Sequence, residues 1–363
     1  MAYTTIDDPS AYFHTQLFSG TGSSQSVTND ANAGDFQPDW VWIKKRAGGT
    51  ARNHILTDST RGVTKCLSTS LADGDFTNTN GLTAFGTDGF TVGSYDSVNE
   101  SDGTYVAWQW KANGGTTTTN DASSTSVGTI DSVYQANTTA GFSIVTWTGT
   151  GSAGTVAHGL GAVPQLIITK NRTDNSTNWQ IYHGFNTSAP ETEVIYFTTG
   201  ATQDYDGFMS DTAPTSTVFS AGGDGSMSGT SGKNIVAYCF APIQGYSKFG
   251  SYTANNSTDG PFVYLGFKPA WIMIRNTSAA ADWPITDNKR EAGNPFGEEI
   301  LFANASSAET NYSGGGIDFL SNGFKIRSSG TNGVHNANNT SHTFIYMAFA
   351  ESPFVSSKGV PTT

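Results

Sequence analysis

One pattern of apolar and polar residues occurs three times along the chain. Each copy has a proline, one spacer residue, three consecutive apolar residues, a fourth residue and then a cation, and the copies are residues 36–46, 162–172 and 267–277. Such runs, rich in β-branched and aromatic residues, are typical of strands buried on both faces. Proline suits the first position of a strand, because no ladder donor is missing there. We therefore predict three tandem β-domains, each built around one central strand.

Further strands are predicted before and after each central strand. They comprise opening strands at about 15–20, 142–149 and 248–253 and closing strands at about 104–111, 234–241 and 344–351. The dipeptides Asp88-Gly89 and Asn322-Gly323 predict tight hairpins, because a type I′ turn needs positive φ at both central residues. No long stretch shows the periodicity of an amphipathic helix. We predict an all-β protein with three tandem antiparallel β-sandwich domains of jelly-roll type.

The domain boundaries follow from the spacing of these strands and from composition. We predict an N-terminal arm at 1–11, sandwich repeats at 12–112, 134–242 and 246–354, a Thr/Ser/Gly-rich linker at 113–133 and a C-terminal tail at 355–363. Only residues 243–245 separate the second and third repeats, so we expect that pair to be packed together. The longer linker predicts a looser connection between the first two repeats.

Composition and charge exclude several classes of protein. Aromatic residues make up 12% of the chain, which is enough for packed cores and too many for a disordered chain. The net charge of −12 argues against a nucleic-acid partner, because binding to phosphates needs a cationic face. The N-terminus resembles no signal peptide, and no apolar run reaches the length of a membrane span. We therefore expect synthesis and folding in a cytoplasm, with Cys66 and Cys239 as buried free thiols.

A polar pattern accompanies the three central strands. A cation ends each strand, and an acid or a histidine follows about 13 residues later; the aligned residues are Lys44, Lys170 and Arg275, and then Asp58, His183 and Asp287. One interpretation is a binding cleft that holds an acid and a base. The other is a structural ion pair at a strand end in every repeat. Recurrence in all three repeats favours structural ion pairs, because one repeat would specialise if catalysis were the purpose.

Two acidic pairs are candidates for hydrolysis or for calcium binding. Asp73 and Asp75 flank one glycine, and Asp204 and Asp206 flank a tyrosine. Glycoside hydrolysis needs two carboxyl groups facing across a cleft, whereas these sequences are typical of tight turns. Their oxygens could hold Ca²⁺, but no twelve-residue calcium loop is present. No nucleophile elbow, phosphate loop or zinc motif occurs in the sequence, so we predict no enzyme activity, no catalytic residues, no metal and no cofactor.

Several aromatic residues lie outside the clearest strands and are candidates for binding. They are Trp147, Trp179, Tyr182, Trp283 and Tyr312. Exposed tryptophan and tyrosine side chains can stack on sugar rings or anchor a protein interface. The alternative for each one is burial in a core.

Segments throughout the chain resemble one family of proteins. WVWIK at 40–44, DSTRG at 58–62, GFTVG at 89–93 with Asn99, and YVAWQWK at 105–111 are similar to the repeated units of marine bacteriophage virion proteins. GYSKFGSYT at 245–253, IDFLSNGFK at 317–325 and YMAFAESPF at 346–354 resemble the last unit of the same family. These proteins are described as tail-fibre-like, with a concanavalin-like or laminin-G-like sandwich.

The resemblance implies a bacteriophage structural protein that resides in the virion. It implies a tail-fibre or appendage component that contacts the host surface, a glycan or a protein, and contacts other virion proteins. Many copies on a symmetric particle imply a symmetric homo-oligomer, and by analogy a homotrimer. Because the first repeat begins within about a dozen residues of Met1, a capsid decoration or head-fibre protein is an alternative. A glycan-binding lectin or polysaccharide depolymerase is a second alternative.

Overall fold

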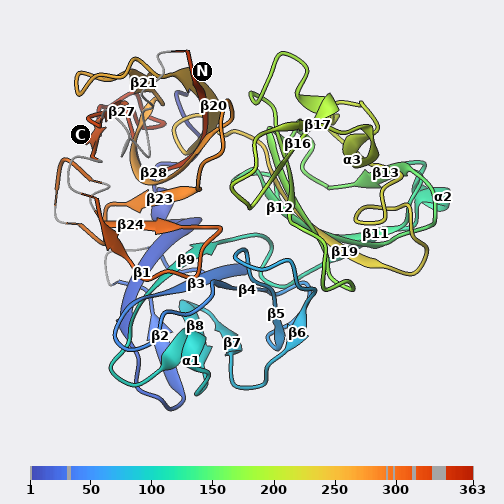
Figure 1. Ribbon diagram of the computed structural model, residues 1–363, viewed down its shortest axis with the longest axis horizontal. Helices are drawn as coiled ribbons and strands as arrows, with labels where there is room; N and C mark the ends of the chain where they lie inside the picture. The colour runs from blue at the N-terminus through green and yellow to red at the C-terminus, as the bar shows by residue number, and fades with distance from the viewer. Residues whose placement is uncertain are drawn as a thin grey trace.

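The protein is all-β and is built from several antiparallel sheets. The computed structural model describes residues 2–30, 34–291, 293–296, 299–312, 316–328 and 341–362. Three groups of strands lie around a common centre (Figure 1). We refer to residues 12–112, 134–242 and 246–354 as segments I, II and III.

Segment I forms a four-stranded sheet and two smaller ones. The four-stranded sheet has the order β1-β9-β3-β4, with bounds Phe13–Ser19, Thr104–Trp110, Trp40–Ala47 and Ile55–Asp58. The smaller sheets are β2-β8-β7, with bounds Gln25–Thr28, Gly89–Val92 and Leu82–Gly86, and β5-β6, with bounds Lys65–Cys66 and Phe76–Thr77. The short helix α1 spans Asp96–Asn99, and the 3-10 turn η1 spans Pro9–Ala11 just before the segment.

Segment II contributes most of an eight-stranded sheet. Its order is β10-β11-β12-β19-β14-β15-β16-β17, with bounds Thr118–Asn120, Ser132–Asn137, Phe142–Thr148, Asn234–Phe240, Leu166–Asn171, Gln180–His183, Glu193–Tyr196 and Gln203–Asp204. A second sheet pairs β13 with β18, Gly154–Ala157 and Val218–Ala221. The short helical elements are α2, η2 and α3, with bounds Ala122–Thr125, Pro190–Thr192 and Asp206–Met209.

Segment III forms a six-stranded sheet and a three-stranded sheet. The larger sheet has the order β20-β28-β22-β23-β24-β25, with bounds Ser247–Thr253, Thr343–Pro353, Phe267–Asn276, Pro284–Asp287, Glu299–Phe302 and Thr310–Asn311. The smaller sheet is β21-β27-β26, with bounds Phe262–Tyr264, Gly323–Ile326 and Ile317–Leu320.

The three segments share one pattern of strand pairing. The orders β1-β9-β3-β4, β12-β19-β14-β15 and β20-β28-β22-β23 correspond strand by strand. The register corresponds as well: the cross-strand pairs are Trp42 with Trp108, Ile168 with Tyr238, and Met273 with Met347. The central strands therefore hold equivalent places, although a division into three tandem jelly-roll domains stays a prediction.

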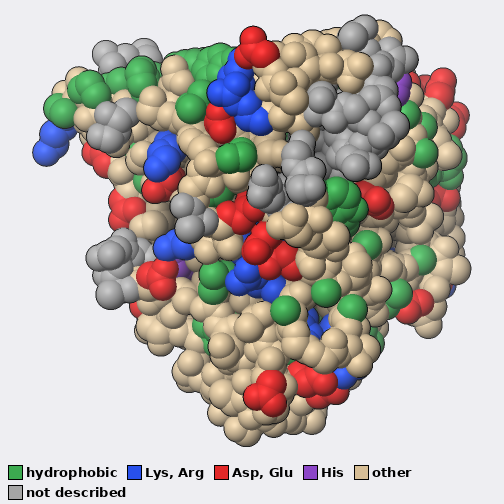
Figure 2. Space-filling model, turned by 60° about the vertical axis from the view of Figure 1, so that its left-hand side comes forward, with side chains coloured by type: hydrophobic (Ala, Val, Ile, Leu, Met, Phe, Trp, Pro, Cys, Tyr) green, Lys and Arg blue, Asp and Glu red, His purple; other side chains and the backbone are tan. Residues whose placement is uncertain are grey.

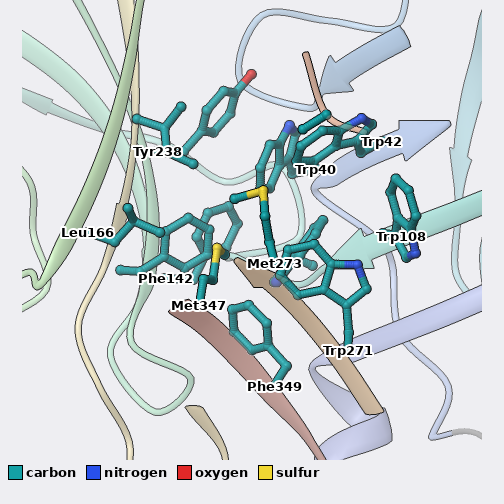
Figure 3. Close-up of a cluster of buried hydrophobic side chains, with 14 of the residues drawn as sticks. Trp40, Trp42, Trp108, Phe142, Leu166, Tyr238, Trp271, Met273, Met347 and Phe349 are labelled. Atoms are coloured by element: carbon teal, nitrogen blue, oxygen red, sulfur yellow. The ribbon is translucent and has the colours of Figure 1, made fainter. Parts of the chain in front are cut away.

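A single hydrophobic cluster joins the three large sheets (Figure 3). The ring of Trp40 stacks on Tyr238 of segment II, with centroids 4.3 Å apart. Trp110 meets Trp271 of segment III edge-on at 5.7 Å. The opposite faces contribute to three further clusters, one per segment, which include residues of the smaller sheets. Each large sheet is thus buried on both faces, and its inner face belongs to a core that all segments share.

The connection between segments I and II differs from the expected loose linker. Residues 113–133 contain β10, a strand of the large sheet, and the helix α2. The buried Asp39 carboxylate accepts hydrogen bonds from the backbone N–H groups of Ala112, Gly114 and Gly115, at 2.8–2.9 Å. A polar, threonine-rich stretch can form an edge strand, because only one of its sides needs a partner strand. Its composition therefore does not distinguish it from a flexible linker.

The expected N-terminal arm packs onto segment III. Tyr3 donates a hydrogen bond to the carbonyl of Gly266 at 2.8 Å, and Ile6 is buried in the central cluster. Asp7 accepts a hydrogen bond from the backbone N–H of Ser357 in the C-terminal tail. The arm therefore bridges the first and third segments, which no covalent linker connects.

Candidate functional site at the junctions between segments

The three cations that end the central strands are buried and cross from one segment to another. Lys44, Lys170 and Arg275 hold equivalent register positions, opposite Val106, Val236 and Ile345. The Lys44 ammonium donates to the carbonyl of Ser306 in segment III at 2.9 Å. Lys170 donates to Ala72 in segment I at 3.1 Å, and Arg275 donates to Gly200 in segment II. The three contacts run in one cyclic direction, from I to III, II to I and III to II.

The predicted pairing of these cations with Asp58, His183 and Asp287 is wrong. Across β3 and β4, Asp58 lies opposite Trp40, four residues from Lys44 along the strand. Four residues of strand span about 13 Å, so the cation and the carboxylate lie at opposite ends of the hairpin. Each predicted partner instead takes part in a separate contact between segments.

Asp58 and Asp287 pair with arginines three residues later. Asp58 contacts Arg61 at 2.5 Å and accepts a hydrogen bond from the hydroxyl of Tyr238 in segment II at 2.7 Å. Burial by itself would lower the pKa of the Arg61 guanidinium, but the adjacent Asp58 carboxylate raises that pKa above its ordinary value. The Asp58 carboxylate thus joins Arg61 of its own segment to an aromatic donor of segment II.

The pair in segment III is built in the same way. Asp287 contacts Arg290 at 2.7 Å and accepts a hydrogen bond from the indole N–H of Trp108 in segment I at 3.0 Å. Burial would lower the pKa of Arg290, but the Asp287 and Glu309 carboxylates raise it. Trp108 and Tyr238 hold equivalent register positions, so the two junctions use one design with different donors.

His183 occupies the third equivalent position because its junction offers no donor for a carboxylate. The residue equivalent to Trp108 and Tyr238 is Met347, whose side chain has no N–H or O–H group. Asn186 stands where the other segments have an arginine. The imidazole Nε2 lies 3.1 Å from the carbonyl of Tyr346, and burial lowers the pKa of His183 to about 4. The ring is therefore neutral, and an aspartate here would be a buried charge without a partner.

A third set of contacts, which the sequence did not reveal, runs in the same cyclic direction as the contacts of the three cations. The imidazole Nε2 of His54 lies 2.9 Å from the carbonyl of Phe302. The indole N–H groups of Trp179 and Trp283 donate to the carbonyls of Ser68 and Tyr196, at 2.7 and 2.9 Å. Positions 54, 179 and 283 align, each four residues before Asp58, His183 or Asp287, but the alignment does not indicate their partners, which belong to other segments.

Burial, the alternative considered for each of the five candidate aromatic residues, holds for four of them. Trp179 and Trp283 are buried at the junctions. Trp147 and Tyr182 are buried in the outer cluster of segment II, and Tyr312 is half-buried with its ring edge-on to Phe302 at 5.7 Å. Trp179, Trp283 and Tyr312 lie next to short strands, where periodicity gives little information, whereas Trp147 lies within the seven-residue strand β12.

Metal-binding clusters are absent from the part of the chain that the structure describes. In the ranges that the structure covers, no group of three or more His, Cys, Asp or Glu residues could hold a metal ion. Asp75, one of the calcium candidates, contacts Arg172 of segment II at 2.8 Å. Cys66 and Cys239 are free and buried, and burial raises the pKa of both thiols. Within those ranges, no helix has the length and apolarity needed to cross a membrane.

Comparison with known proteins assigns a family. A family model described as a domain of unknown function, DUF7483, matches residues 8–353. The chain belongs to the DUF7483 family. The match runs through segments I, II and III, so the DUF7483 unit includes all three junctions. No curated protein matches the chain significantly.

The buried lysines of this DUF7483 chain predict a distinctive pH dependence. Burial lowers the pKa of Lys44, and likewise that of Lys170, from 10.5 to about 8. Between these pH values the unfolded chain binds more protons than the folded chain, so the destabilisation that each buried lysine causes decreases as pH rises. We expect the melting temperature of the wild type, relative to Lys44→Met, to increase between about pH 8 and 10.5.

Thermal melting of both proteins across this range measures the difference. Other groups titrate in both proteins, so their contributions cancel. The exposed Lys358→Met variant is the control and should show no such trend. If the difference in melting temperature between the wild type and Lys44→Met stayed constant with pH, the burial of a desolvated Lys44 ammonium at the junction would be contradicted.

Proposed function

We propose that this DUF7483 chain is a non-enzymatic structural protein of a bacteriophage virion. In this proposal it is a tail-fibre or appendage component that contacts the host surface through three tandem concanavalin-like or jelly-roll sandwiches. The observation that supports a mechanical role best is the closed set of junction contacts around a shared core. Groups that could do chemistry serve instead to hold the segments together.

The state of the titratable groups supports a role without catalysis. Catalytic acids and bases have shifted pKa values and also reach a substrate in a cleft. In this chain the pKa values of His54, His183, Lys44 and Lys170 are all lowered by burial. All four side chains are buried, and each contacts a backbone carbonyl of another segment. Desolvation in a structural interface accounts for these shifts without a substrate.

The exterior supports a function through surface contact. Figure 2 shows one face on which uncharged atoms dominate and acidic and basic side chains lie close to each other. The five candidate aromatic residues for sugar stacking are buried or half-buried, which removes the feature that favoured a lectin or depolymerase. We propose that the protein recognises its partner through polar contacts made by the surface of a rigid molecule. We also propose that the protein assembles as a homotrimer.

Fractionation of the virion tests this proposal. Particles are separated into tail-less heads and tails, and this chain is identified in each fraction by mass spectrometry. We expect it in the tail fraction, and we expect light scattering of the purified protein to give three times the chain mass of 38.3 kDa. Detection on tail-less heads would favour the capsid decoration role, and absence from both fractions would overturn the virion role.

A further inference from the structure

The sheet of segment II has strands at one edge that the sheet of segment I lacks. In segment II, β11 pairs antiparallel with the outer edge of β12, and β10 pairs with β11. The strand equivalent to β12 in segment I is β1, which is the end strand of its sheet. Among the residues that the structure describes, no strand pairs with the outer edge of β1. An open edge of this kind is a template for a further strand.

The strand β11 does more than cover an edge, because one side chain fills the junction between segments I and II. Gln135, buried and opposite Ile144, donates to the hydroxyls of Ser59 and Thr60 at 2.9 and 3.0 Å. Its amide oxygen accepts from the backbone N–H of Gly115 at 2.7 Å. The added strand therefore brings an amide side chain into a polar pocket between two segments.

The equivalent place between segments I and III is a cavity. It has a volume of about 630 Å³ and lies beside the start of β1, where Phe13, His14 and Thr15 line it. Asn288 and Lys289 also line it, and they follow Asp287 as Ser59 and Thr60 follow Asp58. This cavity thus occupies, in the neighbouring junction, the position that Gln135 fills between segments I and II.

The hydroxyl of Thr15 is a buried polar group that lacks a partner in this cavity. Thr15 pairs with Trp108 as Ile144 pairs with Tyr238, so Thr15 is the residue that would face the counterpart of Gln135. The side chain is only 3% exposed, and its Oγ1 atom has no hydrogen-bond partner among the described residues. A buried hydroxyl without a partner destabilises a fold, and an incoming amide group would supply the missing hydrogen bond.

Two of the three carboxylates that line the cavity are paired with lysines. Lys289 contacts Asp30 at 2.7 Å, and Glu351 contacts Lys268 at 2.9 Å. Asp8 accepts hydrogen bonds from Ser10 at the start of η1. β11 itself carries no charged residue, so an uncharged polar strand is the chemistry that fits.

We infer that the edge of β1 at this cavity binds an extended, uncharged polar segment of a partner protein. The segment adds a strand to the sheet of segment I, as β11 does in segment II, and places a glutamine or asparagine opposite Thr15. This inference goes beyond the virion role, since it concerns how any partner attaches to the fold.

Binding of a peptide with the sequence of residues 132–139, which carries no charged side chain, to the intact chain tests the inference. The peptide contains the β11 sequence and Gln135, and fluorescence anisotropy of a labelled form measures its affinity. The covalently attached β11 continues to occupy the edge of β12, so the free peptide reports on other edges. We expect saturable binding, weakened about fivefold by Thr15→Val because one hydrogen bond is lost.

Two designed changes make the test specific to this edge. N288S/K289T gives the cavity the side chains that Gln135 meets in segment I, and should raise the affinity about tenfold. A Gln135→Leu peptide should lose that gain.

Only every second N–H of an added strand faces its neighbour. One peptide is methylated on the backbone nitrogens that would face β1, and the other on the nitrogens that would face away from it. We expect the second peptide to bind and the first not to bind.

Three results would overturn the inference. The first is absence of saturable binding to both the wild type and N288S/K289T. The second is equal binding of the two methylated peptides, which would exclude strand pairing. The third is binding that neither Thr15→Val nor N288S/K289T changes, which would place the peptide at another edge, such as that of β20. None of these results bears on where the protein sits in a virion.

Discussion

Replacing Trp40 with alanine is expected to lower the free energy of unfolding of the whole chain by about 3–5 kcal/mol. Trp40 is fully buried, and its ring contacts Trp110 of its own segment at 4.5 Å. The same ring stacks on Tyr238 and Phe142 of segment II, at 4.3 and 5.9 Å. Removing it leaves a cavity between segments, because the surrounding sheets are held in place by their own ladders.

Calorimetry distinguishes a shared core from three separate ones. In the wild type we expect one unfolding transition whose calorimetric and van't Hoff enthalpies agree, and in Trp40→Ala the same single transition at a lower temperature. The matched control is Phe219→Ala, in the outer cluster of segment II, which should destabilise segment II without contact with the central cluster. Early melting of one segment alone in Trp40→Ala would contradict the shared core.

Replacing Asp58 with alanine is expected to lower the free energy of unfolding by about 3–5 kcal/mol as well. The Arg61 guanidinium is fully buried, and after the change its remaining acidic neighbour is Asp75 at 3.9 Å. The Tyr238 hydroxyl also loses its acceptor in segment I. The destabilisation comes mainly from a buried charge left without its partner.

Denaturant unfolding of three variants tests this explanation. Lys289→Ala removes one side of an exposed ion pair with Asp30 and should change stability by no more than about 0.5 kcal/mol. The double variant D58A/R61M should recover part of the loss, because the uncompensated charge is gone. Equal effects of Asp58→Ala and Lys289→Ala would show that the Asp58 contact contributes little to the junction.

Local patterns predicted the strands well because strand formation depends on neighbouring residues. Apolar runs bounded by proline and a cation identified the three central strands. The dipeptides predicted the hairpins β7-β8 and β26-β27, although neither dipeptide has the positive φ at both residues that a type I′ turn needs. Alignment of the repeats also placed Asp58, His183 and Asp287 at equivalent positions, as the register shows. The alignment did not reveal their partners, because those partners belong to other segments.

The partners of the junction residues were out of reach because no local signal encodes them. Lys44 and Asp58 are close in sequence, and an ion pair between them was the simplest expectation. The ladder of β3 and β4 separates them, and each then meets a segment more than 170 residues away in the chain. Trp179 and Trp283 are buried for the same reason, since the residues that cover them come from other segments.

The sequence by itself determined an all-β chain with three equivalent central strands, because alternation, apolar runs and turn residues act over a few positions. Only the tertiary structure decided that the inner faces of the three large sheets meet in one core and that polar contacts close the segments into a ring. Those contacts depend on how sheets dock against each other, and residues far apart in the chain contribute to every one of them.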